Sequence, residues 1–411
     1  MINRAMLPDH YPIFQIFSGK RVHLGITGSV AAYKSVELWR LLNESMMDAG
    51  ATITSCASQF IGPMSLSALG VDPVYSGNKW DHSDPYPHLF PAHSAHAFAV
   101  IPATANTMAN AAHGLAHDLL STQILAYNRP VHFFPAMNPD MWSNAATQDN
   151  VKLLDTRGHQ IILPHEGKVA CGDEGQGKLA PVPAIYYHIL KALSPQDLAG
   201  QSILVTAGPT HEYFDLVRYI SNPSSGRMGL AIALACWLRG AQVFFVHGPI
   251  GKIFPLPQFH LLPVTSARDM LSACSSVWNQ CDKGIFSAAV SDFAPVPCTD
   301  LKFKKTGLDS MKMEMNSNPD ILATLSTKKN AKQVTVGFAA EASDLEFNAR
   351  DKMQRKNLDI IVANLVRTEQ TPFGSPDNEV LVMDKKGRTE SWPSLSKAQV
   401  AWRLVDWFTL I

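Results

Sequence analysis

Three segments in the first half of the chain place small, hydroxyl or amide side chains directly after a short apolar run. They are residues 25–30 (GITGSV), 102–107 (PATANT) and 135–142 (PAMNPDMW). Backbone N–H groups and the helix dipole at such strand-to-helix junctions can bind a phosphate. Each segment also has an ordinary structural explanation, namely a packing turn, a helix N-cap or a piece of hydrophobic core.

A fourth segment, residues 170–177 (ACGDEGQG), is a glycine-rich loop with one cysteine. Loops of this composition are exposed and mobile, so the Cys171 thiol could act as an acid towards a bound substrate. The alternative is a cysteine without a chemical role.

The second half of the chain carries anion-binding patterns of its own. Residues 205–212 (VTAGPTHE) end a predicted strand, and residues 219–229 (YISNPSSGRMG) open the next helix. Residues 287–293 supply Asp292 after another strand, and residues 302–305 (KFKK) form a basic cluster. An acid and a basic cluster together suit a metal-bound triphosphate. A capped helix and a solvated charge run are the structural alternatives.

The elements that must position these residues begin with a βαβ pattern. Residues 21–27 are predicted as a strand, 30–47 as a helix and 51–56 as the next strand. Short apolar runs at 97–101 and 130–134 continue this order, which is typical of a parallel, doubly wound sheet.

The same order begins again in the second half. Strands are predicted at 202–206, 242–247, 284–287, 333–338 and 358–363, and helices at 226–238, 343–356 and 394–408. A predicted helix at 184–193 ends at Ser194-Pro195, which is typical of a helix end and a short linker. We therefore predict an α/β protein with two Rossmann-like domains, residues 1–193 and 194–411.

Composition limits the functions available to these domains. The 411 residues contain 35 Lys plus Arg and 35 Asp plus Glu, so the net charge gives no reason to expect nucleic acid or a membrane surface as a partner. No apolar run is long enough to cross a bilayer, and the first 20 residues lack the continuous apolar segment of a signal peptide. Six cysteines without a Cys-x-x-Cys pair fit a reducing cytoplasm.

Together, the four segments of the first half resemble the flavoprotein family of cysteine decarboxylases, which includes phosphopantothenoylcysteine decarboxylase. Residues 102–107 resemble the family's Pro-Ala-Ser-Ala-Asn-Thr motif, 135–141 its Pro-x-Met-Asn-x-x-Met motif and 170–177 its substrate lid. The resemblance covers about residues 20–193. It implies an FMN cofactor whose site contains Gly28, Ser29, Ser58, Thr104, Asn106 and Met137.

The resemblance also implies roles for three side chains. His88 assists the proton transfer when the flavin oxidises the substrate thiol to a thioaldehyde, and Asn138 holds the carboxylate that leaves. Cys171 delivers a proton when the resulting enethiol is reduced. The context of His88 (PHLFP) lacks the family's Gly before and Glu after the histidine, and the turn after Ser58 is shortened.

Residues 200–407 resemble phosphopantothenate–cysteine ligase, including 318–321 (NPDI), 336–341 (VGFAAE) and 352–356. The order of the halves is that of a bacterial bifunctional family of coenzyme A synthesis. The resemblance implies that CTP activates 4'-phosphopantothenate as an acyl-cytidylate, that L-cysteine attacks it, and that the product is decarboxylated to 4'-phosphopantetheine. Nucleotide contacts are implied for Ala288, Ala289, Asp292, Lys302, Asn318, Pro319, Asp320, Ile321, Phe338, Lys352 and Lys356, with Mg²⁺ offsetting the triphosphate charge.

Asn222 matches the asparagine of the cysteine-transfer step in this family, although it could instead cap a helix beginning near Ser225. His211 stands where the family commonly has Arg. The resemblance further implies a homo-oligomer with trimeric flavoprotein and dimeric ligase contacts.

Two other functions are open to the sequence. A flavin-binding regulatory subunit is disfavoured by the presence of His88, Asn138 and Cys171. A nicotinamide-dependent reductase in the second half is disfavoured because the Gly-x-Gly-x-x-Gly fingerprint is missing.

Overall fold

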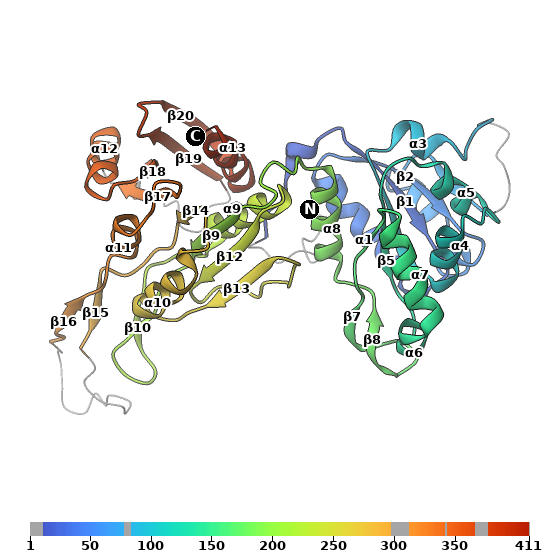
Figure 1. Cartoon of the computed structure of the whole chain (residues 1–411), viewed down its shortest axis with the longest axis horizontal. Coiled ribbons are helices and arrows are strands. Elements are labelled where there is room, and N and C mark those ends of the chain that lie inside the picture. The colour runs from blue at the N-terminus through green and yellow to red at the C-terminus, as the bar shows by residue number, and fades with distance from the viewer. Residues whose placement is uncertain (1–10, 78–83, 297–311, 342, 366–376, 411) are drawn as a thin grey trace. The chain divides into compact units, whose positions relative to one another are not determined.

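The computed structural model describes residues 11–77, 84–296, 312–341, 343–365 and 377–410. The chain forms two compact units (Figure 1). One comprises residues 13–194; the other comprises residues 195–411, and Tyr11 and Pro12 belong to it. Each unit contains a sheet of its own, with helices packed against it. The expected α/β class is thereby confirmed.

The first unit contains a six-stranded parallel sheet with the order β3-β2-β1-β4-β5-β6. Its strands are β1 (Arg21–Ile26), β2 (Asp48–Ile53), β3 (Val74–Ser76), β4 (Ala97–Ala103), β5 (Val131–Pro135) and β6 (Gln160–Ile161). Every residue of β4 is buried, as expected for a parallel strand covered on both faces. The chain runs outward from β1 to β3 and then returns to β4, so the strand order reverses between β1 and β4.

Helices of the first unit surround this sheet. α1 packs against α8, and α4 packs against α5 and α7. The helical elements are η1 (Gln15–Phe17), η2 (Val30–Tyr33), α1 (Lys34–Glu44), η3 (Ala57–Gln59), α2 (Met64–Ser67), α3 (Phe90–Ser94), α4 (Ala105–His113), α5 (Leu119–Ala126), α6 (Pro139–Ser143), α7 (Ala145–Thr156) and α8 (Val182–Leu193).

The helix predicted at 30–47 differs from the observed structure at both ends. The chain first forms the 3-10 turn η2, which the Ser29 side chain caps by accepting from Ala31 N. The α-helical part ends at Glu44, because Met46 takes a φ of +57°, outside the helical region.

The second unit contains an eight-stranded sheet with the order β13-β12-β9-β14-β17-β18-β19-β20. Its strands are β9 (Ser202–Ala207), β12 (Gln242–His247), β13 (Phe259–Pro263), β14 (Lys283–Phe286), β17 (Val334–Glu341), β18 (Ile360–Leu365), β19 (Asp377–Asp384) and β20 (Thr389–Ser396). Pairing is parallel up to β18 and antiparallel from β18 to β20. The order reverses between β9 and β14, as it does between β1 and β4.

Five helices cover this sheet in the described part of the second unit: α9 (Arg227–Leu238), α10 (Ala267–Trp278), α11 (Ile321–Thr327), α12 (Leu345–Arg355) and α13 (Lys397–Thr409). α9 packs against α13, and α10 packs against α11. The helix predicted at 394–408 begins at Lys397 instead, because residues 389–396 pair with β19 as strand β20.

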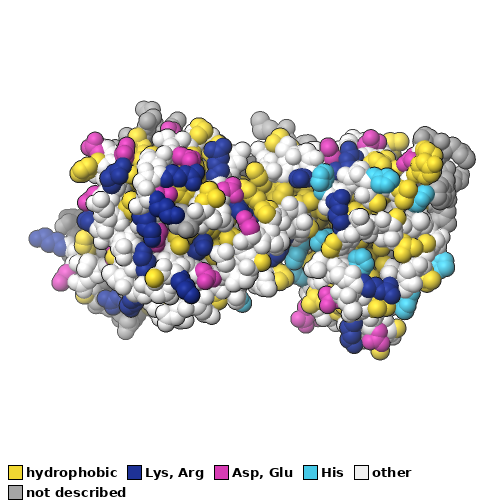
Figure 2. Space-filling model, turned by 45° about the horizontal axis from the view of Figure 1, so that its top comes forward, with side chains coloured by type: hydrophobic (Ala, Val, Ile, Leu, Met, Phe, Trp, Pro, Cys, Tyr) yellow, Lys and Arg dark blue, Asp and Glu magenta, His cyan; other side chains and the backbone are white. Residues whose placement is uncertain are grey.

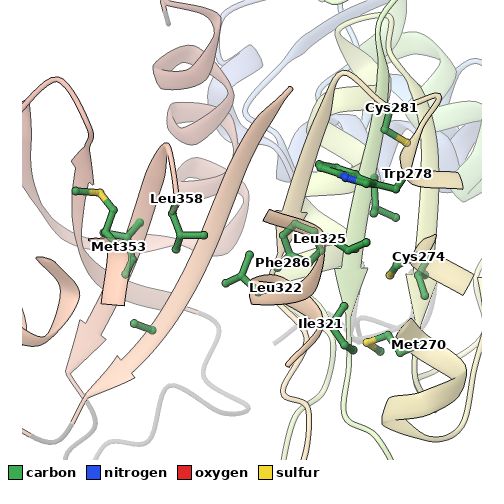
Figure 3. Close-up of a cluster of buried hydrophobic side chains, with 14 of the residues drawn as sticks. Met270, Cys274, Trp278, Cys281, Phe286, Ile321, Leu322, Leu325, Met353 and Leu358 are labelled. Carbon is green, nitrogen blue, oxygen red and sulfur yellow. The ribbon is translucent and has the colours of Figure 1, made fainter. Parts of the chain in front are cut away.

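A hydrophobic cluster fixes α10 and α11 on the sheet (Figure 3). Trp278 of α10 is 2% exposed, and its ring lies 6.2 Å from that of Phe286 in β14. Leu325 of α11 is fully buried in the same cluster. Burying side chains of this size contributes about 1.5–3 kcal/mol each, so the cluster holds α11 firmly where it follows residues 318–320.

The surface has no single sign of charge on the face seen in Figure 2, where Lys and Arg are interspersed with Asp and Glu. This agrees with the net charge of zero. Among the residues that the structure describes, no helix combines the length and apolar character needed to span a membrane.

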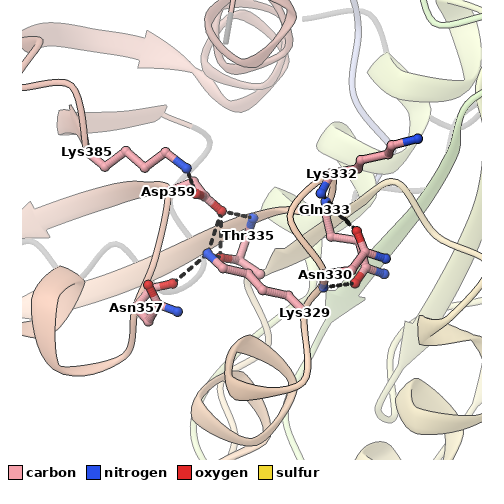
Figure 4. A network of polar contacts seen from close by, with 8 residues as sticks. All are labelled: Lys329, Asn330, Lys332, Gln333, Thr335, Asn357, Asp359 and Lys385. Carbon is pink, nitrogen blue, oxygen red and sulfur yellow. Dashed lines mark hydrogen bonds and ion pairs between the residues drawn. The ribbon is translucent and has the colours of Figure 1, made fainter.

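A buried carboxylate organises the edge of the second sheet where β18 begins (Figure 4). Asp359 is 1% exposed and accepts from Lys329 Nζ at 2.8 Å, from Lys385 Nζ and from Thr335 N at 2.8 Å. Burial alone would raise the pKa of Asp359, but the two ammonium groups and the Thr335 N–H outweigh burial and lower it. The carboxylate therefore stays charged while it ties three chain segments together.

We expect Asp359→Ala to lower the free energy of unfolding by about 3–5 kcal/mol, because it leaves the largely buried Lys329 ammonium without its counter-charge. Since the native pKa is lowered, this contribution is present above the unfolded value of about 4 and is lost as pH falls below it. Guanidinium unfolding of the full chain at neutral and acidic pH measures both effects.

Asp351→Ala is the matched control. Asp351 pairs with Arg355 on the exposed surface of α12, and such a pair contributes only about 0.3–0.5 kcal/mol. Equal losses in the two variants would contradict the role assigned to Asp359.

Candidate active sites

The Thr27 hydroxyl joins the ends of β1 and β4 where the strand order of the first unit reverses. Thr27 Oγ1 donates to Pro102 O at 2.6 Å and accepts from Thr104 N at 3.0 Å. Thr104 then caps α4 by accepting from Thr107 N. Ligands of doubly wound sheets bind in the crevice at such a reversal. Gly28 and Ser29, two of the predicted flavin-site residues, follow Thr27 directly.

The remaining flavin-site residues stand at the same edge of the sheet. Gly28 packs so closely on the turn after β2 that a Cβ atom there would lie 2.6 Å from Cys56 Cβ. Ser58 is exposed in that turn, and Asn106 is exposed in the first turn of α4. Met137 follows β5. Hydroxyls, an amide and the N–H groups at the start of α4 thus gather at one edge, a donor set that fits a flavin phosphate.

Asn138 and Cys171, predicted to act on the substrate, are in contact. Asn138 Nδ2 lies 3.5 Å from Cys171 Sγ and donates to Asp173 Oδ2 at 2.5 Å. The Cys171 thiol donates to the same carboxylate oxygen at 3.2 Å. Asp173 therefore orients both side chains, a role that the sequence analysis missed although the residue lies in the quoted loop.

The segment that carries Cys171 is more ordered than the predicted loop. It is a hairpin of β7 (His165–Lys168) and β8 (Glu174–Lys178), with exposed Cys171 in the turn. β8 is fastened to the chain after β5, because Met137 N donates to Gly177 O at 3.0 Å. A Cβ atom on Gly177 would lie 2.4 Å from Met137 O, so only glycine permits this approach.

His88 comes from a different segment, the turn that precedes α3. Its ring is partly buried and meets the Tyr86 ring edge-on, with the centroids 6.4 Å apart. The carbonyl of Pro87, directly before it, accepts from buried Gln123 Nε2 at 2.9 Å. The histidine turn is thus anchored to α5.

The second unit has a cavity of about 510 Å³ at the carboxyl ends of β9, β14 and β17. It is lined by all of the described residues predicted for the ligase: Asn222, Ala288, Ala289, Asp292, Asn318, Pro319, Asp320, Ile321, Phe338, Lys352 and Lys356. Lys302 lies outside the described residues. Residues from segments more than 100 positions apart in the sequence therefore meet in one cavity.

Close backbone packing brings α9 to this cavity. A Cβ atom on Gly229 would lie 2.4 Å from Ala207 Cβ and 2.7 Å from Ser287 Oγ, so the first turn of α9 can touch the ends of β9 and β14 only with glycine there. The Ser287 hydroxyl donates to Thr206 O at 2.7 Å. These contacts place the start of α9 against the cavity wall.

Two asparagines hold the cavity wall through backbone carbonyls. Asn222 Nδ2 lies 3.3 Å from Ala289 O and 3.1 Å from Val290 O, while Asn318 Nδ2 donates to Ser291 O at 2.9 Å. Asn222 does not cap α9, because the N-cap residue is Gly226. The capping alternative for Asn222 is therefore wrong.

Lysines give the cavity a local positive charge. Lys356 Nζ pairs with Asp320 Oδ2 at 2.7 Å, and Asp320 caps α11 by accepting from Ala323 N. Burial, followed by the charge of Lys356, lowers the pKa of Lys352. Burial would raise the pKa of Asp320, but the Ala323 N–H and Lys356 lower it overall. Among the described residues, four basic side chains line the cavity with two carboxylates, a balance that suits a polyphosphate: Arg227, Lys352, Lys356 and Lys397 with Asp292 and Asp320.

His211 lies on the segment that links β9 to β10 (Glu212–Tyr213). Its ring stacks on Tyr219 of β11 (Tyr219–Ile220), with centroids 3.7 Å apart and an interplanar angle of 10°. Burial lowers the pKa of His211 below 6.5. At neutral pH the imidazole is therefore mainly uncharged and supplies no permanent cation at this position.

No group of three or more His, Cys, Asp or Glu side chains suited to a metal occurs among the described residues.

A small strand pair, β15 (Phe293–Pro295) with β16 (Met315–Ser317), connects Asp292 to Asn318 beside the cavity.

Comparison with known protein families gives a match in each unit. Residues 16–194 match the family model described as Flavoprotein, and residues 198–410 match the model described as DNA/pantothenate metabolism flavoprotein C-terminal domain. The chain is therefore a flavoprotein with a second domain of the pantothenate-metabolism type.

Full-length relatives define the family more closely. The chain is 38% identical to the coenzyme A biosynthesis bifunctional protein CoaBC of Vibrio vulnificus strain YJ016, over 95% of this chain and 98% of that protein. It is 39% identical to CoaBC of Haemophilus influenzae, over 95% and 97%. A crystal structure of the C-terminal domain of a CoaBC protein is 35% identical, covers 52% of this chain and 97% of its own, and has a TM-score of 0.44.

The chain belongs to the family of coenzyme A biosynthesis bifunctional proteins CoaBC. It is a bifunctional enzyme, with a phosphopantothenoylcysteine decarboxylase in the flavoprotein unit and a phosphopantothenate–cysteine ligase in the second unit. The family, the fold class and the pair of activities expected from the sequence are confirmed.

Gly177→Ala tests the hairpin that carries Cys171. The added methyl would meet backbone atoms of Met137 and Pro139, which cannot yield as a side chain tip could. We expect a loss of roughly 1–3 kcal/mol in stability and at least about a tenfold loss of decarboxylation through misplacement of Cys171. Ligation should be unchanged. Thermal unfolding and separate assays of both activities measure this.

Gly62→Ala is the control, since a Cβ atom at Gly62 would meet no atom within 4 Å. If both variants decarboxylate at the parental rate, the hairpin does not need its close approach to Met137.

Proposed function

We propose that the first unit binds FMN along the carboxyl ends of β1, β2, β4 and β5. Support comes from the donors gathered there, and above all from the Thr27 bridge that sets the β1 and β4 ends side by side. The site residues are Gly28, Ser29, Ser58, Thr104, Asn106 and Met137. When bound, the flavin accepts two electrons from the substrate thiol carbon and later returns them.

Three side chains bind the carboxylate or transfer the protons of this reaction: His88, Asn138 and Cys171. His88 accepts a proton during oxidation, and Asn138 donates a hydrogen bond to the carboxylate before carbon dioxide leaves. Cys171 protonates the carbon of the enethiol during the final reduction. The electrons removed in the first step return in the last, so the net change is uptake of one proton and release of carbon dioxide.

The contact among Asn138, Asp173 and Cys171 is the observation that carries this proposal. It sets the carboxylate-binding amide beside the proton donor. Both groups then reach neighbouring atoms of one substrate, as carboxylate loss followed by protonation requires.

For the second unit we propose CTP, with Mg²⁺, as the nucleotide that activates 4'-phosphopantothenate. The carboxylate attacks the α-phosphorus, pyrophosphate leaves, and the cysteine amine then displaces CMP from the acyl-cytidylate. Lys352 and Lys356 offset phosphate charge, and Asp292 and Asp320 are the carboxylates that line the same cavity. This proposal is supported by the cavity, which the described residues predicted for the ligase line together.

Asn222 would serve the transfer of cysteine. Its amide lines the cavity and donates to two carbonyls of the wall, so one of its two N–H groups would turn from the wall to the acyl carbonyl oxygen as negative charge develops there.

The proposal also covers the domain division, the assembly of the enzyme and its location in the cell. The domains are residues 1–193 and 194–411, and the boundary after Leu193 is supported by the helix end there and by the start of the second compact unit at Pro195, whereas Tyr11 and Pro12 belong to the compact unit of the second domain. The enzyme is a homo-oligomer with trimeric flavoprotein and dimeric ligase contacts. It works in the cytoplasm on small-molecule substrates, in keeping with five free cysteines among the described residues.

Cys171→Ser should permit thiol oxidation and carbon dioxide release but block the final reduction, because a hydroxyl is a far weaker acid than a thiol. The enethiol should accumulate and be detected by mass spectrometry, while the flavin stays bound. Formation of phosphopantetheine at the parental rate would show that Cys171 is not the proton donor. Cys56→Ser is the control, since Cys56 is the other exposed thiol among the residues that the structure describes.

Asn222→Asp should release pyrophosphate in a first turnover yet form phosphopantothenoylcysteine about a hundredfold more slowly, because a donor to the developing oxyanion is lost. Quenched-flow measurement of both products, with acyl-cytidylate as the accumulating species, tests this. Parallel loss of pyrophosphate release would mean that Asn222 acts only by holding Ala289 and Val290 in place.

A further inference from the structure

A chain of buried hydrogen bonds in the first unit ends on the residue before His88. It runs through His23 of β1, Thr52 of β2 and Gln123 of α5, which are 0%, 2% and 0% exposed. His23 Nε2 lies 2.9 Å from Thr52 Oγ1, and Thr52 Oγ1 donates to Gln123 Oε1 at 2.6 Å. Gln123 Nε2 then donates to Pro87 O at 2.9 Å.

The direction of every bond in this chain is fixed. Pro87 O can only accept, so the amide nitrogen of Gln123 faces it and the amide oxygen faces Thr52. The single hydroxyl hydrogen of Thr52 goes to that oxygen, so Thr52 accepts from His23 Nε2. His23 is therefore neutral with its hydrogen on Nε2, and burial lowers its pKa to about 3.

Phe90, which follows the turn that bears His88, packs against His23 of the same hydrogen-bond chain. The His23 ring lies 6.3 Å from the ring of Phe90, which begins α3 just after His88, and 5.0 Å from Phe98. A Cβ atom on Gly50 would lie 3.1 Å from His23 Nδ1 and 3.3 Å from the Phe90 ring. His23 is thus held tightly between β2 and α3.

Buried polar side chains lose stability when a partner is removed, whereas an apolar side chain of similar size would fill the same space without any. The bonds run without a break from His23 Nε2 to Pro87 O, and His23 Nδ1 is buried without a hydrogen-bond partner among the described residues. A continuous run of buried bonds favours one arrangement of the segments that it joins. Here those segments are the neighbouring strands β1 and β2, α5 and the turn that bears His88.

We propose that His23, Thr52 and Gln123 are positioning residues for His88: they hold the Pro87 carbonyl and thereby set the place of the imidazole towards the substrate. This inference rests on the proposed role of His88 in thiol oxidation. The three side chains act through the backbone and touch neither substrate nor flavin.

Two variants of Thr52 in the full-length holoenzyme give the first test. Thr52→Val keeps the shape but removes the hydroxyl, and Thr52→Ser keeps the hydroxyl. Anaerobic single-turnover reduction of the bound flavin by phosphopantothenoylcysteine should slow about tenfold to a hundredfold in Thr52→Val and stay near the parental rate in Thr52→Ser. Flavin affinity should not change in either.

A matched control removes another buried hydroxyl contact of the same unit. Ser45 Oγ lies 2.6 Å from Tyr186 OH, and both side chains are fully buried. Ser45→Ala should lower the melting temperature without slowing flavin reduction. If Ser45→Ala slows reduction as much as Thr52→Val, the effect reflects stability alone and the proposal is overturned.

A double-mutant cycle with Gln123→Met and His88→Asn gives the second test. If Gln123 acts through His88, Gln123→Met slows flavin reduction in the parental enzyme but adds little in the His88→Asn background. Additive effects would overturn the proposal. If flavin reduction is slow in His88→Asn but near the parental rate in Gln123→Met and Thr52→Val, only the positioning role is rejected. If flavin reduction stays near the parental rate in His88→Asn, the proposed role of His88 itself is rejected.

Discussion

Both units share one interaction: a threonine hydroxyl that forms hydrogen bonds between two neighbouring parallel strands at the point where strand order reverses. In the first unit Thr27 bonds to the end of β4. In the second, Thr206 accepts from Ala288 N at 3.3 Å through its hydroxyl, while its carbonyl accepts from Ser287. The strand ends are thus held together beneath each candidate site.

The cavity and the ion pairs of Asp359 lie at opposite ends of the strands of the second sheet. The ligase cavity lies at the carboxyl ends of the parallel strands, whereas Asp359 and its lysines lie where β18 begins. The charged anchor can therefore be rigid without restricting the residues that line the cavity. In the first unit the polar anchor is neutral and lies inside the core, and it supports a turn rather than a sheet edge.

The sequence predicted those parts of the sites that follow strands directly. Short apolar runs followed by Gly28, Thr104 or Met137 placed those residues at one edge, because parallel strands end together. Asp173 was missed because a carboxylate in a glycine-rich loop looks like ordinary solvated charge. His23, Thr52 and Gln123 were missed because they sit among apolar neighbours in predicted strands or helices. Their partners are 29 to 71 positions away, and no local pattern records such pairing.

The described thiols of the two units differ in their exposure to oxidants. Cys56, beside Gly28, and Cys171, beside Asn138, are exposed in the first unit. Cys236, Cys274 and Cys281 are buried in the second unit, and burial raises the pKa of each thiol to about 12, which leaves almost no reactive thiolate. Among the described thiols, peroxide or an alkylating agent would therefore reach Cys56 and Cys171 of the first unit before the buried thiols of the second.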